Sequence, residues 1–324
     1  MKTLVTGATG FLGATLTRRL VKEGVAVRAV KREHSRLDLL ADVANQVEWV
    51  IADVSDRLSL DEALRDVTRV YHCAANIGFD GATSRSQFID VNVRGTANMV
   101  DAALDADVTR FVQTSSIAAL GQRIGSIDCM DESTEWRQSS YNSDYGESKY
   151  RSELEVQRGI AEGLDAVIVN PSVIMGVGRS GENTMLLVET VRKRGIPFIP
   201  VGGTNVVDIL DVVDGHIRAM EKGRKGERYL LTGENLSWSN IISTLADALD
   251  VDPPKRFASP ALMMSVATLL ELGARLIRKR PLLTREAARM SSRTSCYVNE
   301  KAIRELGCSF RPFSETAFRI AEEF

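Results

Sequence analysis

The sequence contains few of the residues that build metal sites and disulfide frameworks. Its 324 residues include only four cysteines and three histidines. The cysteines are widely spaced and form no CxxC pair, so we expect no metal site. We predict that Cys73, Cys129, Cys296 and Cys308 are reduced thiols of a cytoplasmic protein.

An excess of charge of either sign is also missing. The net charge is −2, with 44% hydrophobic and 26% charged residues. These proportions are typical of a soluble globular protein. Nothing favours a polyanionic partner, so we do not expect nucleic-acid binding.

Long hydrophobic runs are missing as well. The N-terminal apolar stretch is soon interrupted by glycines, so we predict no signal peptide. The most apolar segment, residues 260–280, contains Glu271 and Arg275, and its run before Glu271 is too short to span a bilayer. We therefore expect no integral membrane segment. An amphipathic helix over an apolar pocket is the favoured interpretation, with contact to a membrane surface as the alternative.

The first half of the chain alternates apolar, strand-like segments with segments of helical periodicity. Such alternation predicts a Rossmann-type α/β fold, a doubly wound parallel sheet with helices on both faces. Strands are predicted at residues 3–8, 25–30, 47–53, 69–75, 110–116 and 165–172, with helices at 11–24, 59–66, 86–107 and 143–163.

A glycine-rich turn, TGATGFLG, directly follows the first strand and opens the first helix. Gly7 permits a tight turn, Gly10 lets a pyrophosphate approach the backbone, and Gly13 lets the helix pack on the strand. The helix N-terminus offers unpaired N–H groups and a positive dipole to phosphates. This context favours dinucleotide binding over a merely structural turn.

The alternation of strands and helices ends near residue 175, and the sequence from Ser237 onward is mostly helical. We predict a dinucleotide-binding Rossmann domain of residues 1–175 plus about 204–233. A smaller, mostly helical substrate lobe would comprise about 176–203 plus 234–324.

The end of the second strand selects the nucleotide. An acid there would hold a ribose 2′-hydroxyl, whereas an arginine would accommodate a 2′-phosphate. The sequence has Arg28, Lys31 and Arg32, with no acid until Glu33. This favours NADP(H) over NAD(H), with solvated surface charges as the alternative. Asp53 would face the adenine amino group or be a plain acid at the end of the third strand.

A tyrosine precedes a lysine by four residues twice, in YGESK from Tyr145 and in YVNEK from Tyr297. Tyr145 and Lys149 share one face of a predicted helix, so the ammonium would lower the phenol pKa from about 10 and permit acid–base chemistry. Ser115 and Ser116 end the fifth strand, at the edge of the sheet where ligands bind. The second copy straddles a predicted helix start and has no such serine, so we interpret it as structural.

Six motifs follow in order: TGATGFLG, HCAA, VNVRGT, QTSSIAALG, YGESK and VNPSVIMG. Together they resemble the extended short-chain dehydrogenase/reductase superfamily, also called the NAD-dependent epimerase/dehydratase family, over essentially the whole chain. The resemblance implies an enzyme with Tyr145 as acid/base, Lys149 lowering its pKa and holding the ribose, and Ser116, rather than Ser115, as the catalytic hydroxyl. Asn92 would support the active site or be a helix-internal polar residue.

The cofactor cleft implied by these motifs has alanines along one wall and lies near the end of the sixth strand. Family members often dimerise through the helix with the Tyr/Lys pair, so we expect a homodimer. The predicted cofactor-binding residues are Gly7, Thr9, Gly10, Phe11, Leu12, Arg32, Asp53, Val54, Ala74, Ala75, Thr114, Tyr145, Lys149, Pro171 and Ser172.

Two branches of the family compete. Sugar-nucleotide enzymes commonly carry an Arg–Asp pair whose arginine holds the substrate pyrophosphate, but this sequence has Thr204 and Asn205 there. TSSIAALG and VRAVKRE instead resemble 3β-hydroxysteroid dehydrogenases and dihydroflavonol reductases. We expect an NADP(H)-dependent oxidoreductase that interconverts a ketone and a secondary alcohol on a small, apolar substrate. The alternatives are an NAD(P)-dependent sugar-nucleotide epimerase/dehydratase and, remotely, a non-catalytic dinucleotide-binding protein.

Overall fold

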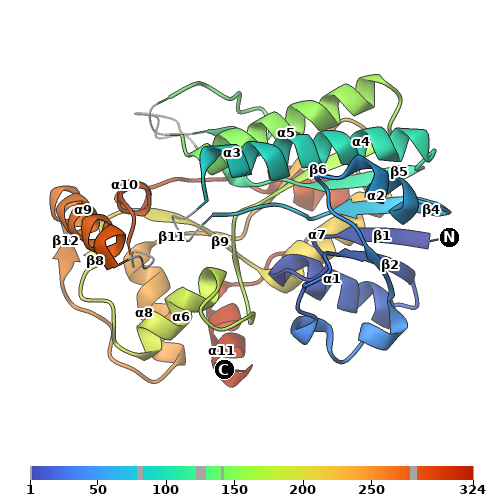
Figure 1. Ribbon diagram of the computed structural model, residues 1–324. Helices are drawn as coiled ribbons and strands as arrows, with labels where there is room; N and C mark the ends of the chain where they lie inside the picture. The colour runs from blue at the N-terminus through green and yellow to red at the C-terminus, as the bar shows by residue number, and fades with distance from the viewer. Residues whose placement is uncertain (1, 79–82, 122–128, 140–141, 278–282, 324) are drawn as a thin grey trace.

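A seven-stranded parallel sheet forms the centre of the larger lobe of the molecule (Figure 1). The computed structural model describes residues 2–78, 83–121, 129–139, 142–277 and 283–323. The strand order is β10-β6-β5-β4-β1-β2-β3. From β1 the chain adds strands first on one side and then on the other, which confirms the predicted doubly wound fold. The strands are β1 (Lys2–Thr6), β2 (Ala26–Lys31), β3 (Glu48–Ile51), β4 (Val67–His72), β5 (Arg110–Thr114), β6 (Ala166–Pro171) and β10 (Arg228–Leu231).

The register of the central strands brings their carboxyl ends together. Thr6 pairs with His72, His72 with Gln113, and Thr114 with Val169. The segments after β1, β4, β5 and β6 therefore emerge side by side at one edge of the sheet. In open parallel sheets, ligands bind at this carboxyl edge.

Helices cover both faces of the sheet, because most connections between neighbouring strands run through a helix with one apolar side (Figure 1). Leu16 and Val212 belong to the core on one face, and Met99 and Val156 to the core on the other. The first face carries α1 (Phe11–Lys22) and α7 (Ile209–Lys222); the second carries α2 (Arg57–Ala63), α4 (Gly95–Asp105) and α5 (Asp144–Ala161). A short helix α3 (Arg85–Phe88) and a π-helical turn (Ile89–Arg94) lead into α4, and 3-10 turns lie at Asp38–Leu40, Ala44–Gln46 and Ile117–Leu120.

A second, smaller lobe lies beside the carboxyl edge of the sheet (Figure 1). Met175, Val188, Ile241 and Phe313 are buried in its core. Its strands are β7 (Val173–Met175), β9 (Gly203–Asp208) and β11 (Glu234–Ser237) in one sheet, and β8 (Ile199–Pro200) with β12 (Phe257–Ala258) in another. Its helices are α6 (Asn183–Arg192), α8 (Trp238–Ala248), α9 (Pro260–Ile277), α10 (Arg285–Ser291) and α11 (Phe313–Glu323), with a π-helical turn at Ala302–Leu306.

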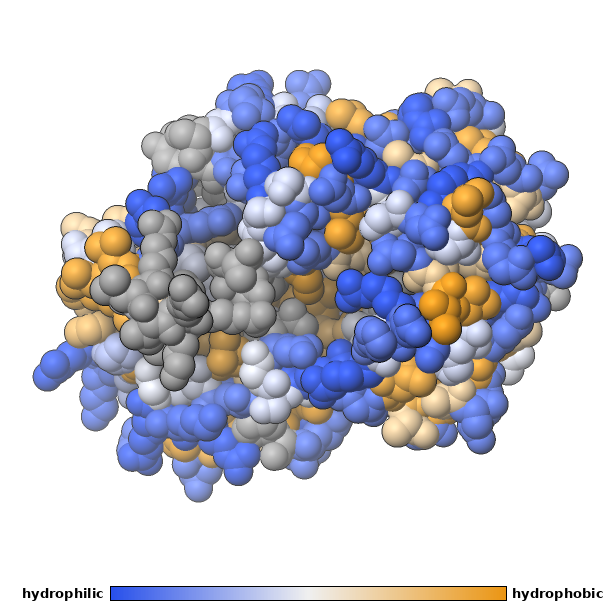
Figure 2. Space-filling model, viewed as in Figure 1, coloured by the Kyte–Doolittle hydropathy of each residue, from blue (hydrophilic) through white to orange (hydrophobic). Residues whose placement is uncertain are grey.

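Helix α9 has one buried and one exposed apolar side. Met263 and Ala267 pack against Ala258 of β12 and Ala288 of α10. Leu269 is 70% exposed on the opposite side, and Figure 2 shows hydrophobic surface at this end of the second lobe. Among the described residues, no helix combines the length and hydropathy needed to cross a membrane.

A disulfide links Cys129 to Cys296, so the prediction of four reduced thiols is wrong for this pair. No local motif predicts the bond, because 167 residues separate the two positions. The fold brings them together, since Met130 N donates to Cys296 O at 2.8 Å and Val298 N donates to Met130 O at 3.0 Å. Cys73 and Cys308 are free thiols.

Reducing the disulfide will lower the free energy of unfolding. A cross-link that closes a long loop restricts the unfolded chain, and its loss costs about 2–5 kcal/mol. Thermal melting with and without a reductant measures the difference. A Cys129→Ser/Cys296→Ser double variant is the control, and its melting temperature will not respond to the reductant. Equal melting temperatures for the wild type in both conditions would show that the bond adds no stability.

Candidate active site

The glycine-rich turn after β1 packs too tightly for side chains at two of its three glycines. Gly7 has φ +67°, and a Cβ there would lie 2.7 Å from the backbone of Cys73 and Ala74. A Cβ on Gly13 would clash with the Gly7 carbonyl group. At Gly10 the nearest atom is Gly7 O at 3.3 Å, so the space above Gly10 is open for a ligand to approach.

The first turn of α1 has the properties of a phosphate-binding site. Gly10 is its N-cap residue and provides no side-chain cap, and the turn contains no acidic residue. Its leading N–H groups and the positive end of the helix dipole therefore face the open space above Gly10. This cradle fits a dinucleotide pyrophosphate.

The basic residues at the end of β2 have different environments. Arg28 is buried, and it pairs with Glu48 at 2.6 Å and donates to Ala63 O at 3.0 Å, so it is not available to a nucleotide. Arg32 follows the strand and has an exposed side chain. Burial raises the pKa of Asp53, but hydrogen bonds from Ser55 and the charge of Arg32 outweigh it, and the net shift is downward.

Ser116, Tyr145 and Lys149 come together at the carboxyl edge of the sheet. Ser116 follows β5, and its Oγ accepts a hydrogen bond from Ala118 N at 3.2 Å. Tyr145 lies in the first turn of α5 and is hydrogen-bonded to Ser116. Lys149, one helical turn later, is 2% exposed. Its Nζ donates to Thr114 O at 2.7 Å.

Burial shifts the pKa of both titratable groups toward the neutral form. It raises the pKa of Tyr145 to about 12, although the hydrogen bond to Ser116 acts in the opposite direction. It lowers the pKa of Lys149 to about 8, although the charge of Glu153 acts in the opposite direction. The expected lowering of the Tyr145 pKa is therefore not found in this structure. The phenol packs near Phe88, with ring centroids 6.0 Å apart, and the Lys149 ammonium is directed to a carbonyl instead.

Asn92 is buried in the π-helical turn before α4 and joins the β4 loop to α5. Its Oδ1 accepts from Asn76 N at 2.7 Å. Its Nδ2 donates to Asn76 O and to Ser148 Oγ, each at 2.9 Å. Asn92 is thus adjacent to the Tyr145–Lys149 segment, and all of its polar atoms are used within the protein.

The other predicted cofactor residues lie at the same edge of the sheet. Thr9, Phe11 and Leu12 lie in the glycine-rich turn and the start of α1, and Thr114 ends β5. Ala74 and Ala75 follow β4, Val54 follows β3, and Pro171 and Ser172 lie at the end of β6. Ala74 N donates to Thr6 Oγ1 at 3.2 Å, which fixes the alanine loop against β1.

An ion pair that the sequence did not predict links the second lobe to the loop after β2. Arg179 lies in the glycine-rich loop after β7, and its guanidinium binds Asp38 at 2.6 Å. A Cβ on Gly178 in the same loop would lie 2.8 Å from the Phe11 ring. The loop therefore passes directly over the start of α1. The glycines in GVGRSGEN were the signal for a close approach.

His216 is a second group that sequence reasoning missed. Its Nε2 lies 2.8 Å from Thr114 Oγ1, and its Nδ1 lies 2.8 Å from Val212 O. Burial lowers its pKa to about 4, so it is neutral near pH 7. It supports the end of β5 from the α7 side.

The second Tyr/Lys spacing has a different arrangement. Tyr297 is buried, whereas the Lys301 ammonium binds Glu227 at 2.6 Å and Arg228 O at 2.8 Å. Lys301 is thus engaged by β10 and the turn before it, as a structural element.

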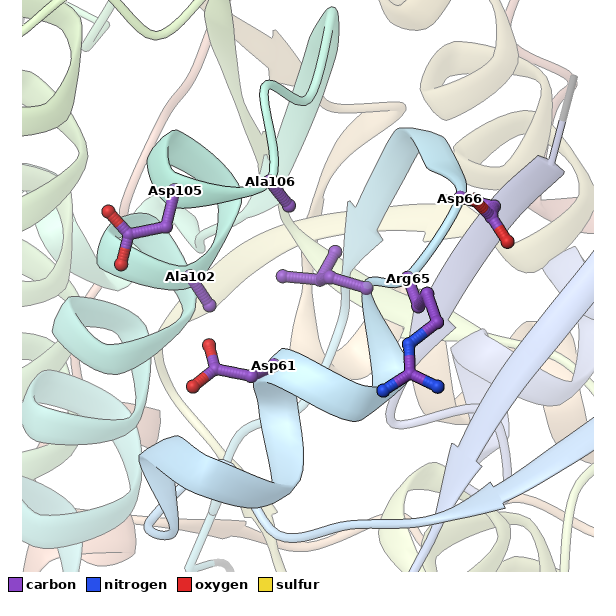
Figure 3. Close-up of a pocket in the computed structure, with 7 residues that line it drawn as sticks. Asp61, Arg65, Asp66, Ala102, Asp105 and Ala106 are labelled. Carbon is purple, nitrogen blue, oxygen red and sulfur yellow. The ribbon is translucent and has the colours of Figure 1, made fainter.

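A surface hollow of about 410 Å³ lies away from this site (Figure 3). Arg65 and Asp66 lead into β4, and Asp105 and Ala106 lead toward β5, so the hollow is at the amino edge of the sheet. Its lining contains three acidic side chains, Asp61, Asp66 and Asp105, against one arginine, Arg65, so its charge does not favour phosphates.

Comparison with known proteins places this geometry in a family. Residues 3–232 match the NAD dependent epimerase/dehydratase family. The chain is 36% identical to sterol demethylase protein B of Methylococcus capsulatus, covering 95% of this chain and 93% of the relative. It is 32% identical to a putative dihydroflavonol 4-reductase of Synechocystis sp., covering 94% and 88%. The crystal structure of gox2253 is 33% identical, with a TM-score of 0.84 over 99% of this chain and 96% of that one.

The family match covers more than half of the chain, and two relatives exceed 30% identity over nearly its whole length. The dinucleotide cradle after β1 agrees with that match. The chain therefore belongs to the NAD dependent epimerase/dehydratase family and is an NAD(P)-dependent enzyme of the extended short-chain dehydrogenase/reductase type.

Proposed function

We propose that the protein is an NADP(H)-dependent oxidoreductase that interconverts a ketone and a secondary alcohol on a small, apolar substrate. The observation that carries this proposal is the hydrogen bond between Ser116 and Tyr145, with buried Lys149 one helical turn away. Two hydroxyl groups at the carboxyl edge, beside a cradle for a dinucleotide, are suited to protonate and polarise a carbonyl oxygen.

Each side chain has a distinct task in this reaction. The nicotinamide, when bound, supplies or accepts the hydride at the carbonyl carbon. Ser116 Oγ donates to the carbonyl oxygen and stabilises its developing negative charge. Tyr145 gives its proton to that oxygen during reduction and removes it during oxidation. Burial raises the pKa of Tyr145 to about 12. In the proposed reaction, the positive charge of Lys149 acts in the opposite direction and favours the phenolate.

The apolar nature of the substrate is supported by the side chains that follow Ser116. Ile117 and Leu120 form a buried cluster with Met130 and Leu230. The names of two relatives, a sterol demethylase protein and a putative dihydroflavonol 4-reductase, agree with a substrate of this class. Only a limited number of polar groups then need to orient the carbonyl.

The region that would hold a substrate pyrophosphate does not favour a nucleotide sugar. Asn205 is buried, its Nδ2 donates to Asn235 Oδ1 at 2.9 Å, and its Oδ1 accepts from Gly233 N at 2.9 Å. Its amide therefore joins β9 to β11 and to the residue just before β11. Neither Asn205 nor Thr204 supplies a guanidinium for two phosphate charges.

The proposal is tested by supplying NADPH with a panel of apolar ketones and, separately, with nucleotide sugars. We expect NADPH to be oxidised with ketones only, and the loss of nicotinamide absorbance measures this oxidation. Epimerised or dehydrated nucleotide sugar, produced by protein that retains its dinucleotide through purification, would replace the proposal with the sugar-nucleotide alternative.

Arg32→Ala will weaken NADPH binding and leave NADH binding unchanged. Arg32 is exposed and directly follows β2, where a 2′-phosphate would lie, and charge-assisted hydrogen bonds contribute about 1.5–3 kcal/mol. The dissociation constant for NADPH should rise about 10- to 100-fold in a fluorescence titration. Arg94→Ala is the matched control, since Arg94 is exposed and pairs with Asp90 at 2.9 Å. A wild type that prefers NADH would contradict the NADP assignment.

A further inference from the structure

A buried carboxylate lies behind the catalytic residues, and the mechanism above does not use it. Glu153 follows Lys149 by four residues and Tyr145 by eight, so all three share one face of α5. The Glu153 side chain is only 3% exposed. Acidic residues are rarely this buried unless partners hold them.

The partners of Glu153 among the described residues are the residue that follows β5, a residue near the end of β6 and the first residue of β10. Ser115 Oγ donates to Glu153 Oε1 at 2.5 Å, and Asn170 Nδ2 donates to the same oxygen at 2.6 Å. Arg228 Nη2 of β10 lies 3.5 Å from Oε2. These groups are donors, which suits an ionised carboxylate as their acceptor.

The end of β5 is thereby tied to α5 at three consecutive residues. Thr114 O accepts from Lys149 Nζ at 2.7 Å, and Ser115 Oγ donates to Glu153. Ser116 O accepts from Asn170 Nδ2 at 2.9 Å, and Asn170 is itself bound to Glu153. The proposed reaction requires Ser116 Oγ to lie beside the Tyr145 hydroxyl. By holding the end of β5, the Glu153 carboxylate fixes how these two hydroxyl groups lie relative to each other.

Among the described residues, Glu153 is the one carboxylate whose charge acts on Lys149. At the end of β4, burial lowers the pKa of His72 and raises the pKa of the next residue, Cys73, to about 11, so both are neutral near pH 7. His216 of α7, which reaches Lys149 through Thr114, is neutral as well. The charge of Glu153 raises the pKa of Lys149, while burial lowers it.

We propose that Glu153 is a positioning residue: it holds the end of β5 so that Ser116 faces Tyr145, and it keeps Lys149 in its cationic form. This inference deepens the proposed function and rests on it only where kcat is measured. The effect of Glu153 on the charge of Lys149 is measured by dinucleotide binding, which needs no reaction.

The experiment compares the purified wild type with Glu153→Gln, Ser115→Ala and Glu155→Gln. NADPH binding is titrated by fluorescence over a range of pH. Wild-type affinity will fall as the pH rises through the pKa of Lys149, about 8, because the ammonium loses its proton. Glu153→Gln keeps the shape and the acceptor oxygen but removes the charge. The midpoint of the fall should therefore move to lower pH by about one unit.

The two other variants separate charge from geometry. Ser115→Ala keeps the carboxylate but removes one tie to β5, so the midpoint will stay in place while kcat for ketone reduction falls several-fold with KM little changed. Glu155→Gln removes the charge of another carboxylate of α5, which pairs with Arg158 at 3.0 Å. This variant will change neither the midpoint of the pH dependence nor kcat.

The outcomes distinguish the inference from the proposed function. A midpoint for folded Glu153→Gln equal to that of the wild type overturns the electrostatic role. If thermal melting shows that Glu153→Gln does not fold, Ser115→Ala decides, and an unchanged kcat overturns the positioning role. A wild type that binds NADPH but reduces no ketone defeats the proposed function and leaves the binding test intact.

Discussion

Tyr145→Phe will lower kcat for ketone reduction about 10²- to 10⁴-fold, the range that general acid–base catalysis contributes. The phenyl ring keeps its packing against Phe88, 6.0 Å away between centroids, so the fold and the cofactor site remain. Only the hydroxyl that is bonded to Ser116 disappears. Steady-state turnover gives kcat, and a fluorescence titration should give an almost unchanged dissociation constant for NADPH.

Tyr297→Phe is the matched control, because Tyr297 begins the other Tyr/Lys spacing and is also buried. The Lys301 ammonium is engaged by Glu227 at 2.6 Å, so the loss of this hydroxyl should change kcat by no more than a few-fold. A Tyr145→Phe variant with wild-type turnover would transfer the acid–base role to another group. A larger loss of kcat in Tyr297→Phe than in Tyr145→Phe would also contradict the assignment of Tyr145 as the acid–base group.

Gly10→Ala and Gly13→Ala will affect the dinucleotide cradle in different ways. At Gly10 the new methyl group meets only Gly7 O, at 3.3 Å, so the fold tolerates it, but it occupies the space that a pyrophosphate needs. Losing charge-assisted bonds of about 1.5–3 kcal/mol weakens NADPH binding about 10- to 100-fold. At Gly13 the methyl group clashes with the Gly7 carbonyl, and overpacking of this kind costs about 1–3 kcal/mol of stability.

Thermal melting and NADPH titration on both variants separate the two effects. Gly10→Ala should melt with the wild type and bind poorly, whereas Gly13→Ala should melt earlier and bind poorly. Gly24→Ala, in a turn where a Cβ meets nothing within 4 Å, is the control for the general cost of losing a glycine. Because φ at this position is +77°, the Gly24→Ala variant should be slightly less stable than the wild type, with NADPH binding unaffected. Wild-type affinity in Gly10→Ala would show that the phosphates bind elsewhere.

The elements of the sheet were predictable because their signals are local. Buried parallel strands read as continuous apolar runs, and β6 is buried at all six of its positions. The glycine spacing of the first turn follows from contacts between Gly7 and Gly13, six residues apart. The same holds for Tyr145 and Lys149, which one helix aligns.

Other features depend on residues that are far apart in the chain. Arg28 and Arg32 are equally basic in the sequence. In the structure Arg28 is buried and bound to Glu48 and the Ala63 carbonyl, whereas Arg32 is exposed. The disulfide joins Cys129 to Cys296 across 167 residues, and no spacing rule predicts such a pair. Arg179 reaches Asp38 in the same way.

The sequence by itself determined the doubly wound sheet and the dinucleotide turn, and it supplied the Ser/Tyr/Lys set as a prediction, because periodicity and short motifs record interactions between near neighbours. The tertiary structure alone decided the electrostatic environment of that set. Burial raises the pKa of Tyr145 to about 12 and lowers that of Lys149 to about 8, and Glu153 acts on Lys149 from inside the protein. A pKa depends on desolvation and on charges from every packed element, and these exist only once the chain has folded.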